Sequence, residues 1–203
     1  MNNNNNDNNR LNSDRLYVIA GIDYSITSPA LWTGNTGYAL TSSSKRQGNY
    51  NLNPYDPNPN NLNPYSIHID AYPKYKTDTD RHRYLADWAL DILTTNQVTH
   101  VILEGYSYGS KGRSVFQIGE ATGCLKQALR NAHINCEIVT PTQVKKHATG
   151  SGGADKRRMI GAFADATGID LFDVLGVNPS AKTIGAPVTD LVDAYWVSQM
   201  PVW

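Results

Sequence analysis

Two short apolar segments, each ending directly at an acidic residue, constrain the fold of this chain most. Residues 16–22 form a nearly continuous apolar run followed at once by Asp23, and residues 100–103 form another followed by Glu104. Runs of this length and composition are typical of strands buried on both sides. Such a strand does not normally end in an unpaired acid, so each carboxylate is expected at the rim of a sheet, where open α/β folds place their functional sites.

The remaining apolar patterns predict strands and helices that alternate in the second half of the chain. Helical spacing begins after a cap at Thr77 or Thr79, and Thr189 is a candidate cap for the last helix. A short helical turn is expected from Pro141. Strands are predicted at 37–41, 66–71 and 136–139, and helices at 78–95, 115–132, 156–167 and 187–200. Strands followed by alternating helix and strand indicate an α/β fold.

Two low-complexity stretches divide the chain. Residues 1–14 are mostly asparagine and predict a disordered tail, which leaves 15–203 as one domain. Residues 48–64 contain four prolines and seven asparagines and predict a long loop inserted into that domain. The asparagine content is compatible with a phage, a virus or a low-GC genome.

Two further acids, Asp190 and Asp193, stand near the start of the last predicted helix. Their spacing of three residues puts both carboxylates on one helix face. Together with Asp23 and Glu104 they would repel one another unless cations offset the charge. A pair of Mg²⁺ ions about 4 Å apart does this and can clamp the attacking and leaving oxygens of a phosphodiester.

The formal net charge is zero, but the charges are unevenly placed. Residues 81–158 hold 11 lysines and arginines against 6 acids, whereas residues 159–203 hold one lysine and five aspartates. A basic middle fits contacts to phosphates, and acids elsewhere fit the binding of cations. Nucleic acid therefore stays a candidate partner despite the zero net charge.

Six short motifs, in this order, resemble the RuvC family of Holliday-junction resolvases. No single motif is specific, but their shared order extends over most of the chain outside the tail. They are G-I-D at 21–23, I-L-E at 102–104, S-V-F-Q-I-G-E-A-T-G at 114–123, P-T-Q-V-K-K at 141–146, G-S-G-G-A-D-K at 150–156 and D-L-V-D-A at 190–194. One departure is G-I-D-Y-S at 21–25, where the family has G-I-D-P-G.

The resemblance implies a ribonuclease H-like mixed sheet flanked by helices on both faces. It implies two Mg²⁺ ions, with Mn²⁺ as a substitute, on Asp23, Glu104, Asp190 and Asp193. It also implies a homodimer that nicks four-way DNA junctions during recombination or replication.

The family's basic residues near the scissile phosphate correspond to Lys145 and Lys156, compact charges suited to stabilising developing negative charge. Lys146 and Arg157, beside them, are expected either to contact nucleic acid or to form a solvated basic face.

The glycine-rich segment after Glu104 is a candidate DNA-contacting loop. Glycines allow close backbone approach, tyrosines offer stacking faces, and basic side chains suit phosphates. The family uses an aromatic residue here to open the junction centre, and Tyr106 and Tyr108 are equal candidates. Lys111 and Arg113 are the candidate phosphate contacts.

Three other functions share parts of this sequence pattern. A different ribonuclease H-like nuclease, acting on branched DNA or on RNA, shares the metal site and stays open. An actin-like sugar kinase also opens with G-I-D, but it needs a second domain and a second phosphate loop that 203 residues do not supply. A junction-binding module without catalysis is disfavoured by four intact carboxylates. The polar start and the absence of a long apolar run predict a protein of the cytoplasm or nucleoid, not a secreted one.

Overall fold

The computed structural model describes residues 17–52, 65–106 and 113–202, with only the backbone described for residues 113 and 114. The strands are β1 Ile19–Asp23, β2 Ala30–Thr33, β3 Thr36–Thr41, β4 Gly48–Leu52, β5 Tyr65–Ala71, β6 His100–Glu104 and β7 Asn135–Val139. The helices are η1 Ser44–Arg46, α1 Asp78–Thr95, α2 Arg113–Asn131, α3 Pro141–Thr149, α4 Lys156–Thr167, α5 Leu171–Val174 and α6 Val188–Ser198. None of these helices combines the length and hydropathy that a membrane span requires.

The strands form one mixed sheet in the order β4-β5-β3-β2-β1-β6-β7. Strands β1, β2 and β3 form an antiparallel meander, and β6 and β7 continue from β1 in parallel. Strand β5 is parallel to β3 and therefore also runs in the direction of β1. The carboxyl ends of β1, β3, β5, β6 and β7 consequently lie at one edge of the sheet, called here the carboxyl edge.

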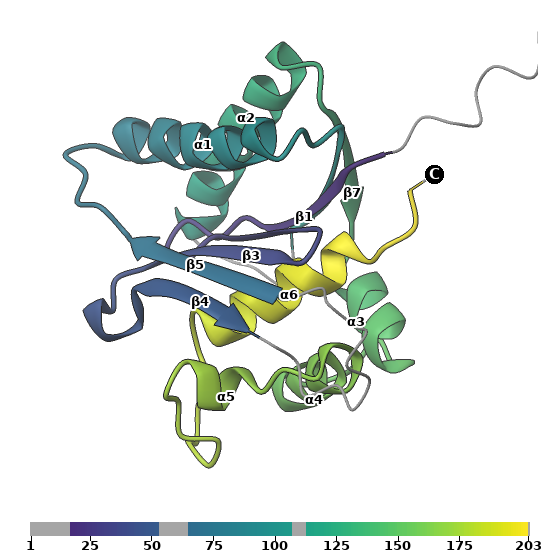
Figure 1. Cartoon of the computed structure of the whole chain (residues 1–203). Coiled ribbons are helices and arrows are strands. Elements are labelled where there is room, and N and C mark those ends of the chain that lie inside the picture. Colours follow the sequence, from purple (N-terminus) through teal and green to yellow (C-terminus); the bar gives the residue numbers. More distant parts are fainter. Residues whose placement is uncertain (1–16, 53–64, 107–112, 203) are drawn as a thin grey trace, which may run out of the picture.

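Helices cover both faces of the sheet, as the resemblance implied (Figure 1). Helices α1 and α2 lie on one face, over a core that includes Leu85, Leu125 and the β1 residue Ile22. Helices α3, α4 and α6 lie on the other, over a core that includes Trp32, Phe163 and Leu191. The ring of Trp32 meets those of Phe163 and Tyr195 edge-on, at centroid distances of 5.7 and 5.3 Å.

Helix α6 lies directly against β1, and Gly21 makes this approach possible. A Cβ atom at Gly21 would fall 2.1 Å from the backbone nitrogen of Ser198 and 2.4 Å from the carbonyl oxygen of Ala194. Backbone atoms cannot move aside as a flexible side chain can, so only glycine fits here. The glycine of the G-I-D motif therefore sets the distance between β1 and the helix that carries Asp190 and Asp193.

The helix predictions are largely confirmed. Helices α1 and α4 have the predicted bounds, and the Thr77 side chain caps α1 by accepting from the Asp80 N–H. The turn expected at Pro141 extends to a nine-residue helix, stabilised by a capping box between Thr140 and Gln143. The predicted cap at Thr189 is wrong, because Pro187 holds the N-cap position and Thr189 is buried within α6.

Two strands were not predicted. Strand β2 has four residues, all buried, and is too short to show a periodicity. Strand β4 lies within the segment interpreted as a loop, so that interpretation is wrong for Gly48–Leu52. An edge strand paired only with β5 tolerates polar, exposed side chains, and the prolines begin after it. The rest of that segment, residues 53–64, and the predicted tail at 1–14 lie outside the described residues.

Candidate metal centre

The sheet brings Asp23 and Glu104 together at the carboxyl edge. Asp23 is the last residue of β1, and Glu104 is the last residue of β6. These strands are adjacent and parallel, with Ile22 paired to Leu103, so the two acids follow paired residues. Both side chains are half-buried at the rim, as the sequence pattern predicted.

Helix α6 adds the other two carboxylates from the opposite side. Asp190 and Asp193 lie on its first half, and its second half packs closely on β1 at Gly21. The Thr189 hydroxyl donates to Asp190 Oδ1 over 3.2 Å, and the Ser28 side chain also hydrogen-bonds Asp190. The other oxygen, Asp190 Oδ2, is buried and has no hydrogen-bond partner among the described residues.

The geometry suits a divalent metal ion. Asp23, Glu104 and Asp193 each offer one carboxylate oxygen, and the three oxygens lie within 4.8 Å of one another. Hard cations such as Mg²⁺ prefer an all-oxygen ligand set of this kind. The free, buried Asp190 Oδ2 is a further ligand atom that nothing else satisfies. The residues present therefore fit a divalent cation.

The carboxyl groups titrate abnormally because they are crowded and partly removed from water. Burial and then the charges of Glu104, Asp190 and Asp193 raise the pKa of Asp23 well above its usual value. Burial and then Asp193 raise the pKa of Glu104 to about 8, and burial and then Asp190 raise that of Asp193 to about 6. Burial also raises the pKa of Asp190, against hydrogen bonds that lower it. Such a cluster gains from a cation that neutralises it.

Two lysines oppose this negative charge. Lys156, the first residue of α4, lowers the pKa values of Asp23, Asp190 and Asp193. Lys145 on α3 lowers those of Glu104 and Asp193. Both lysines therefore lie close enough to act on the carboxylates electrostatically, and their place near a scissile phosphate stays a prediction.

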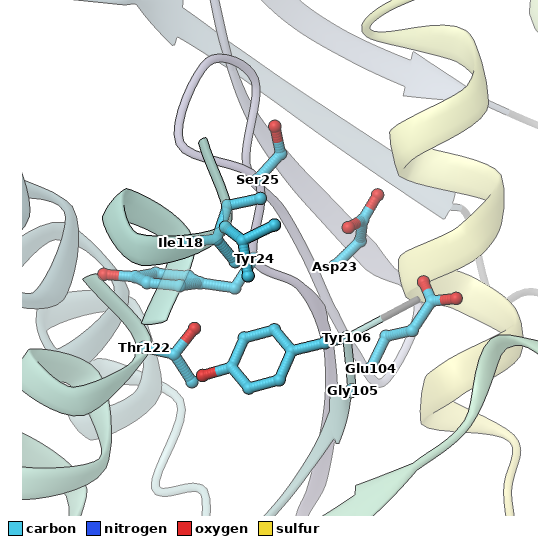
Figure 2. Close-up of a pocket in the computed structure, with 9 residues that line it drawn as sticks. Asp23, Tyr24, Ser25, Glu104, Gly105, Tyr106, Ile118 and Thr122 are labelled. Atoms are coloured by element: carbon cyan, nitrogen blue, oxygen red, sulfur yellow. The ribbon is translucent and has the colours of Figure 1, made fainter. Parts of the chain in front are cut away.

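A cavity of about 200 Å³ opens beside the carboxylates, between the carboxyl edge and α2. Asp23 and Glu104 form one side, and Tyr24, Tyr106 and Thr122 are among the other lining residues. Figure 2 shows the Asp23 and Glu104 carboxyl groups beside α6, and the Tyr106 ring reaching toward Thr122. Tyr106 is 46% exposed, so its ring is available to a ligand.

The predicted nucleic-acid contacts are only partly described. Tyr108 and Lys111 lie outside the described residues, as does the side chain of Arg113. Lys146 is exposed on α3. The Arg157 guanidinium donates to the carbonyl oxygens of Pro179 and Ala181, over 2.5 and 2.6 Å. Its contact with nucleic acid stays a prediction, but the side chain already holds the segment between α5 and α6.

Sequence reasoning missed Ser28 and Tyr24. Ser28 belongs to none of the six motifs, yet it hydrogen-bonds Asp190. Tyr24 replaces the family's proline, is 5% exposed and lines the cavity. No local pattern marks either residue, because their roles depend on segments distant in sequence.

Comparison with known proteins agrees with this geometry. Residues 73–163 match the family model described as Crossover junction endodeoxyribonuclease RuvC. The RuvC of Salinibacter ruber is 28% identical over 86 residues, which cover 40% of this chain and 48% of that relative. The match thus spans about half the length of the curated relative.

Solved structures of the same type share the fold. Thermus thermophilus RuvC gives a TM-score of 0.53 at 16% identity, over 89% of this chain and 92% of the other. The values are the same for T. thermophilus RuvC in complex with a Holliday junction substrate. The yeast mitochondrial Holliday junction resolvase gives a TM-score of 0.50 at 10% identity, over 90% of this chain and 76% of the other. By sequence over residues 73–163, and by fold over about nine tenths of its length, the chain is thus similar to the RuvC-type Holliday-junction resolvases.

Proposed function

We propose that this protein is a metal-dependent endonuclease that nicks four-way DNA junctions. The observation that carries the proposal is the set of three carboxylate oxygens, from Asp23, Glu104 and Asp193, within 4.8 Å of one another and opposed by lysines. A pair of Mg²⁺ ions, or Mn²⁺ in their place, would be held by these residues and Asp190. When bound, such ions stabilise the charge that develops on a phosphodiester during hydrolysis.

The chain's own residues have distinct parts in this proposal. Asp190 is oriented by Thr189 and Ser28, so that its buried Oδ2 is left to bind. Lys145 acts on Glu104, Lys156 acts on Asp23, and both act on Asp193. Both lysines would attract the scissile phosphate and stabilise its added charge. Tyr106, an exposed residue that lines the cavity, would stack on an unpaired base.

The four-way junction is proposed as the substrate because the sequence and fold are similar to RuvC proteins, one of them solved with a Holliday junction. Resolving a junction takes two symmetric nicks, which a homodimer with one site per subunit would deliver. Such a role, in recombination or DNA repair, would place the protein in the cytoplasm or on the nucleoid. A ribonuclease H-like nuclease acting on other branched DNA or on RNA is the second candidate, because the carboxylate set alone does not select a substrate.

A substrate panel tests the proposal. The full chain is incubated with Mg²⁺, Mn²⁺ or EDTA and with a four-way junction, a flap, a linear duplex or an RNA–DNA hybrid of matched length. We expect paired nicks in the junction, dependence on the added metal and little cutting of duplex. Asp165→Asn, an exposed aspartate on α4, is the matched control for the site variants.

The outcomes separate the two candidates. Preferred cleavage of the flap or the hybrid would contradict the four-way junction as the substrate but would leave the proposed metal site intact. Cleavage that persists in EDTA, or in the Asp23→Asn variant, would overturn the metal-dependent mechanism itself. Unpaired nicks from a protein that sediments as a monomer would refute the homodimer.

A further inference from the structure

We infer that the segment between β5 and α1, through Lys74 and Lys76, forms a second contact with the DNA backbone. This inference rests on the proposed junction-cutting function and adds to it a surface outside the metal centre. It is called here the β5–α1 loop and comprises residues 72–77. None of the sequence motifs drew attention to it.

The topology places the loop at the same edge as the metal centre. Strand β5 runs parallel to β3 and hence in the direction of β1, so the loop leaves the sheet at the carboxyl edge. In Figure 1 the loop leads from the arrowhead of β5 to α1. Between β5 and β1 lie β3 and β2, so three strand spacings separate the two ends, roughly 14 Å.

Hydrogen bonds tie the loop to the segment that follows Asp23. The Tyr72 hydroxyl donates to the carbonyl oxygen of Ile26, three residues after Asp23. The Tyr72 N–H donates to the carbonyl oxygen of Thr41 at the end of β3, over 2.8 Å. The Tyr75 ring contacts the rings of Tyr72 and Tyr84, at centroid distances of 5.5 and 5.7 Å. The loop is therefore anchored at the carboxyl edge by its aromatic residues.

The lysines between these anchors face solvent. Lys74 and Lys76 are both exposed, on either side of the half-buried Tyr75. Within the described residues, neither lysine has a carboxylate at ion-pair distance. The nearby acid Asp78 is already bound by Arg81 and by Gln117 of α2, each over 2.8 Å. Among the residues that the structure describes, no carboxylate thus neutralises either of these two positive charges.

This arrangement fits a DNA strand whose phosphates pass the metal centre and continue toward the β5–α1 loop. Lys145 and Lys156 come from α3 and α4, on the face of the sheet that α6 also covers, and the β5–α1 loop lies at the same edge toward β5. Since one DNA strand advances about 3.4 Å per nucleotide along the duplex axis, roughly 14 Å corresponds to about four base pairs. Lys74 and Lys76 would therefore contact phosphates about four base pairs from the cut.

The salt dependence of junction binding tests this inference. Binding of a four-way junction is measured in EDTA over a range of salt concentrations, for the wild type and for the Lys74→Ala/Lys76→Ala variant. Each lost phosphate contact lowers the slope of log affinity against log salt by about 0.9, so we expect a drop of about 2. Single-turnover cleavage at saturating protein should be unchanged, because neither lysine acts on the carboxylates.

Two controls distinguish a phosphate contact from a structural effect. The Lys74→Arg/Lys76→Arg variant keeps both charges and should keep the wild-type slope. Arg130→Ala removes an exposed cation from the far end of α2, which runs away from the carboxyl edge, and should change the slope little. A slope equal to wild type in the alanine variant, or an equal drop in Arg130→Ala, would overturn the inference.

Uncharged methylphosphonate linkages locate the contact. Placed about four base pairs from the nick, they should weaken wild-type binding but not binding by the alanine variant. If the methylphosphonates weakened binding by both proteins equally, the lysines would not contact the DNA at that position. If the wild type neither binds nor nicks the junction, the proposed function has failed, and that result is distinct from failure of this loop alone.

Discussion

The two pairs of carboxylates reach the same centre by different means. The strand-borne pair, Asp23 and Glu104, is aligned by the register of two adjacent parallel strands. The helix-borne pair, Asp190 and Asp193, depends on how closely α6 packs on β1, and therefore on Gly21. The first arrangement follows from backbone hydrogen bonds, the second from the close packing of the α6 backbone on Gly21, between segments about 170 residues apart in sequence. Variants of each pair can show whether both contribute to one function.

The largest expected effect is on cleavage. Asp193→Asn should reduce the single-turnover rate on a bound junction by roughly 10³-fold or more, because it removes a ligand oxygen and its charge. Junction binding should be intact or tighter, since a carboxylate that repels phosphate is gone. Glu104→Gln should behave in the same way if the two pairs form one centre. Near-normal cleavage by Asp193→Asn would mean that the strand-borne pair suffices.

A smaller effect is expected from the lysines. Lys156→Ala should lower the cleavage rate of bound junction by about 10 to 10³-fold, because a charge that faces Asp23, Asp190 and Asp193 is lost. Its neighbour Arg157 serves as the matched comparison. Arg157→Ala should weaken binding and leave the single-turnover rate nearly normal. Since the Arg157 side chain also donates to the carbonyl oxygens of Pro179 and Ala181, the thermal unfolding of the Arg157→Ala variant should be measured as well. If both substitutions had equal effects on the cleavage rate and on binding, the assignment of Lys156 to the active site would be wrong.

The pH dependence of stability separates the two pairs further. Folding raises the pKa of Glu104 from 4.5 to about 8 and that of Asp193 from 3.8 to about 6. Between the unfolded and folded pKa values the folded protein holds more protons, so its stability falls as pH rises through that window. Without metal, the free energy of unfolding should therefore decrease from about pH 4 to pH 8.

The two pairs should account for overlapping parts of this curve. Glu104→Gln should flatten the decrease over the whole range from about pH 4.5 to pH 8, whereas Asp193→Asn should flatten only the part below about pH 6. Mg²⁺ should stabilise the wild type more at pH 8 than at pH 5, because it binds the deprotonated carboxylates. Urea unfolding in EDTA and in Mg²⁺ measures both effects. Stability that rises steadily with pH in EDTA would contradict the crowded cluster.

The smallest expected effect is on Mg²⁺ binding and comes from the segment that leads into α6. The Arg46 guanidinium donates over 2.7 Å to the carbonyl oxygen of Ala186, four residues before Asp190. Arg46→Ala should loosen only the helix-borne pair and weaken Mg²⁺ binding by a few-fold, since the packing at Gly21 remains. The exposed Lys45 provides the control, Lys45→Ala. A loss of metal binding as large as that from Asp193→Asn would show that Arg46 does more than position α6.

Sequence patterns predicted most of this architecture because they report on local burial. The apolar runs before Asp23 and Glu104 marked β1 and β6, and the helical spacing after Thr77 gave α1 its bounds. The patterns failed where tertiary context replaces periodicity. Strand β2 is buried along its whole short length, and β4 is a polar edge strand made possible by its pairing with β5. The order of the motifs along the chain indicated the fold class before any contact was known.

The sequence by itself determined the ligand types, their order and the face of α6 on which Asp190 and Asp193 lie. Those features follow from residue chemistry and from the repeats of strand and helix. Only the tertiary structure decided the contact of Gly21 with α6, the hydrogen bond from Ser28 to Asp190 and the place of the β5–α1 loop at the carboxyl edge. Each of these joins segments far apart in sequence, and such contacts leave no periodic trace because packing is specified by the matching of surfaces, not by local repetition.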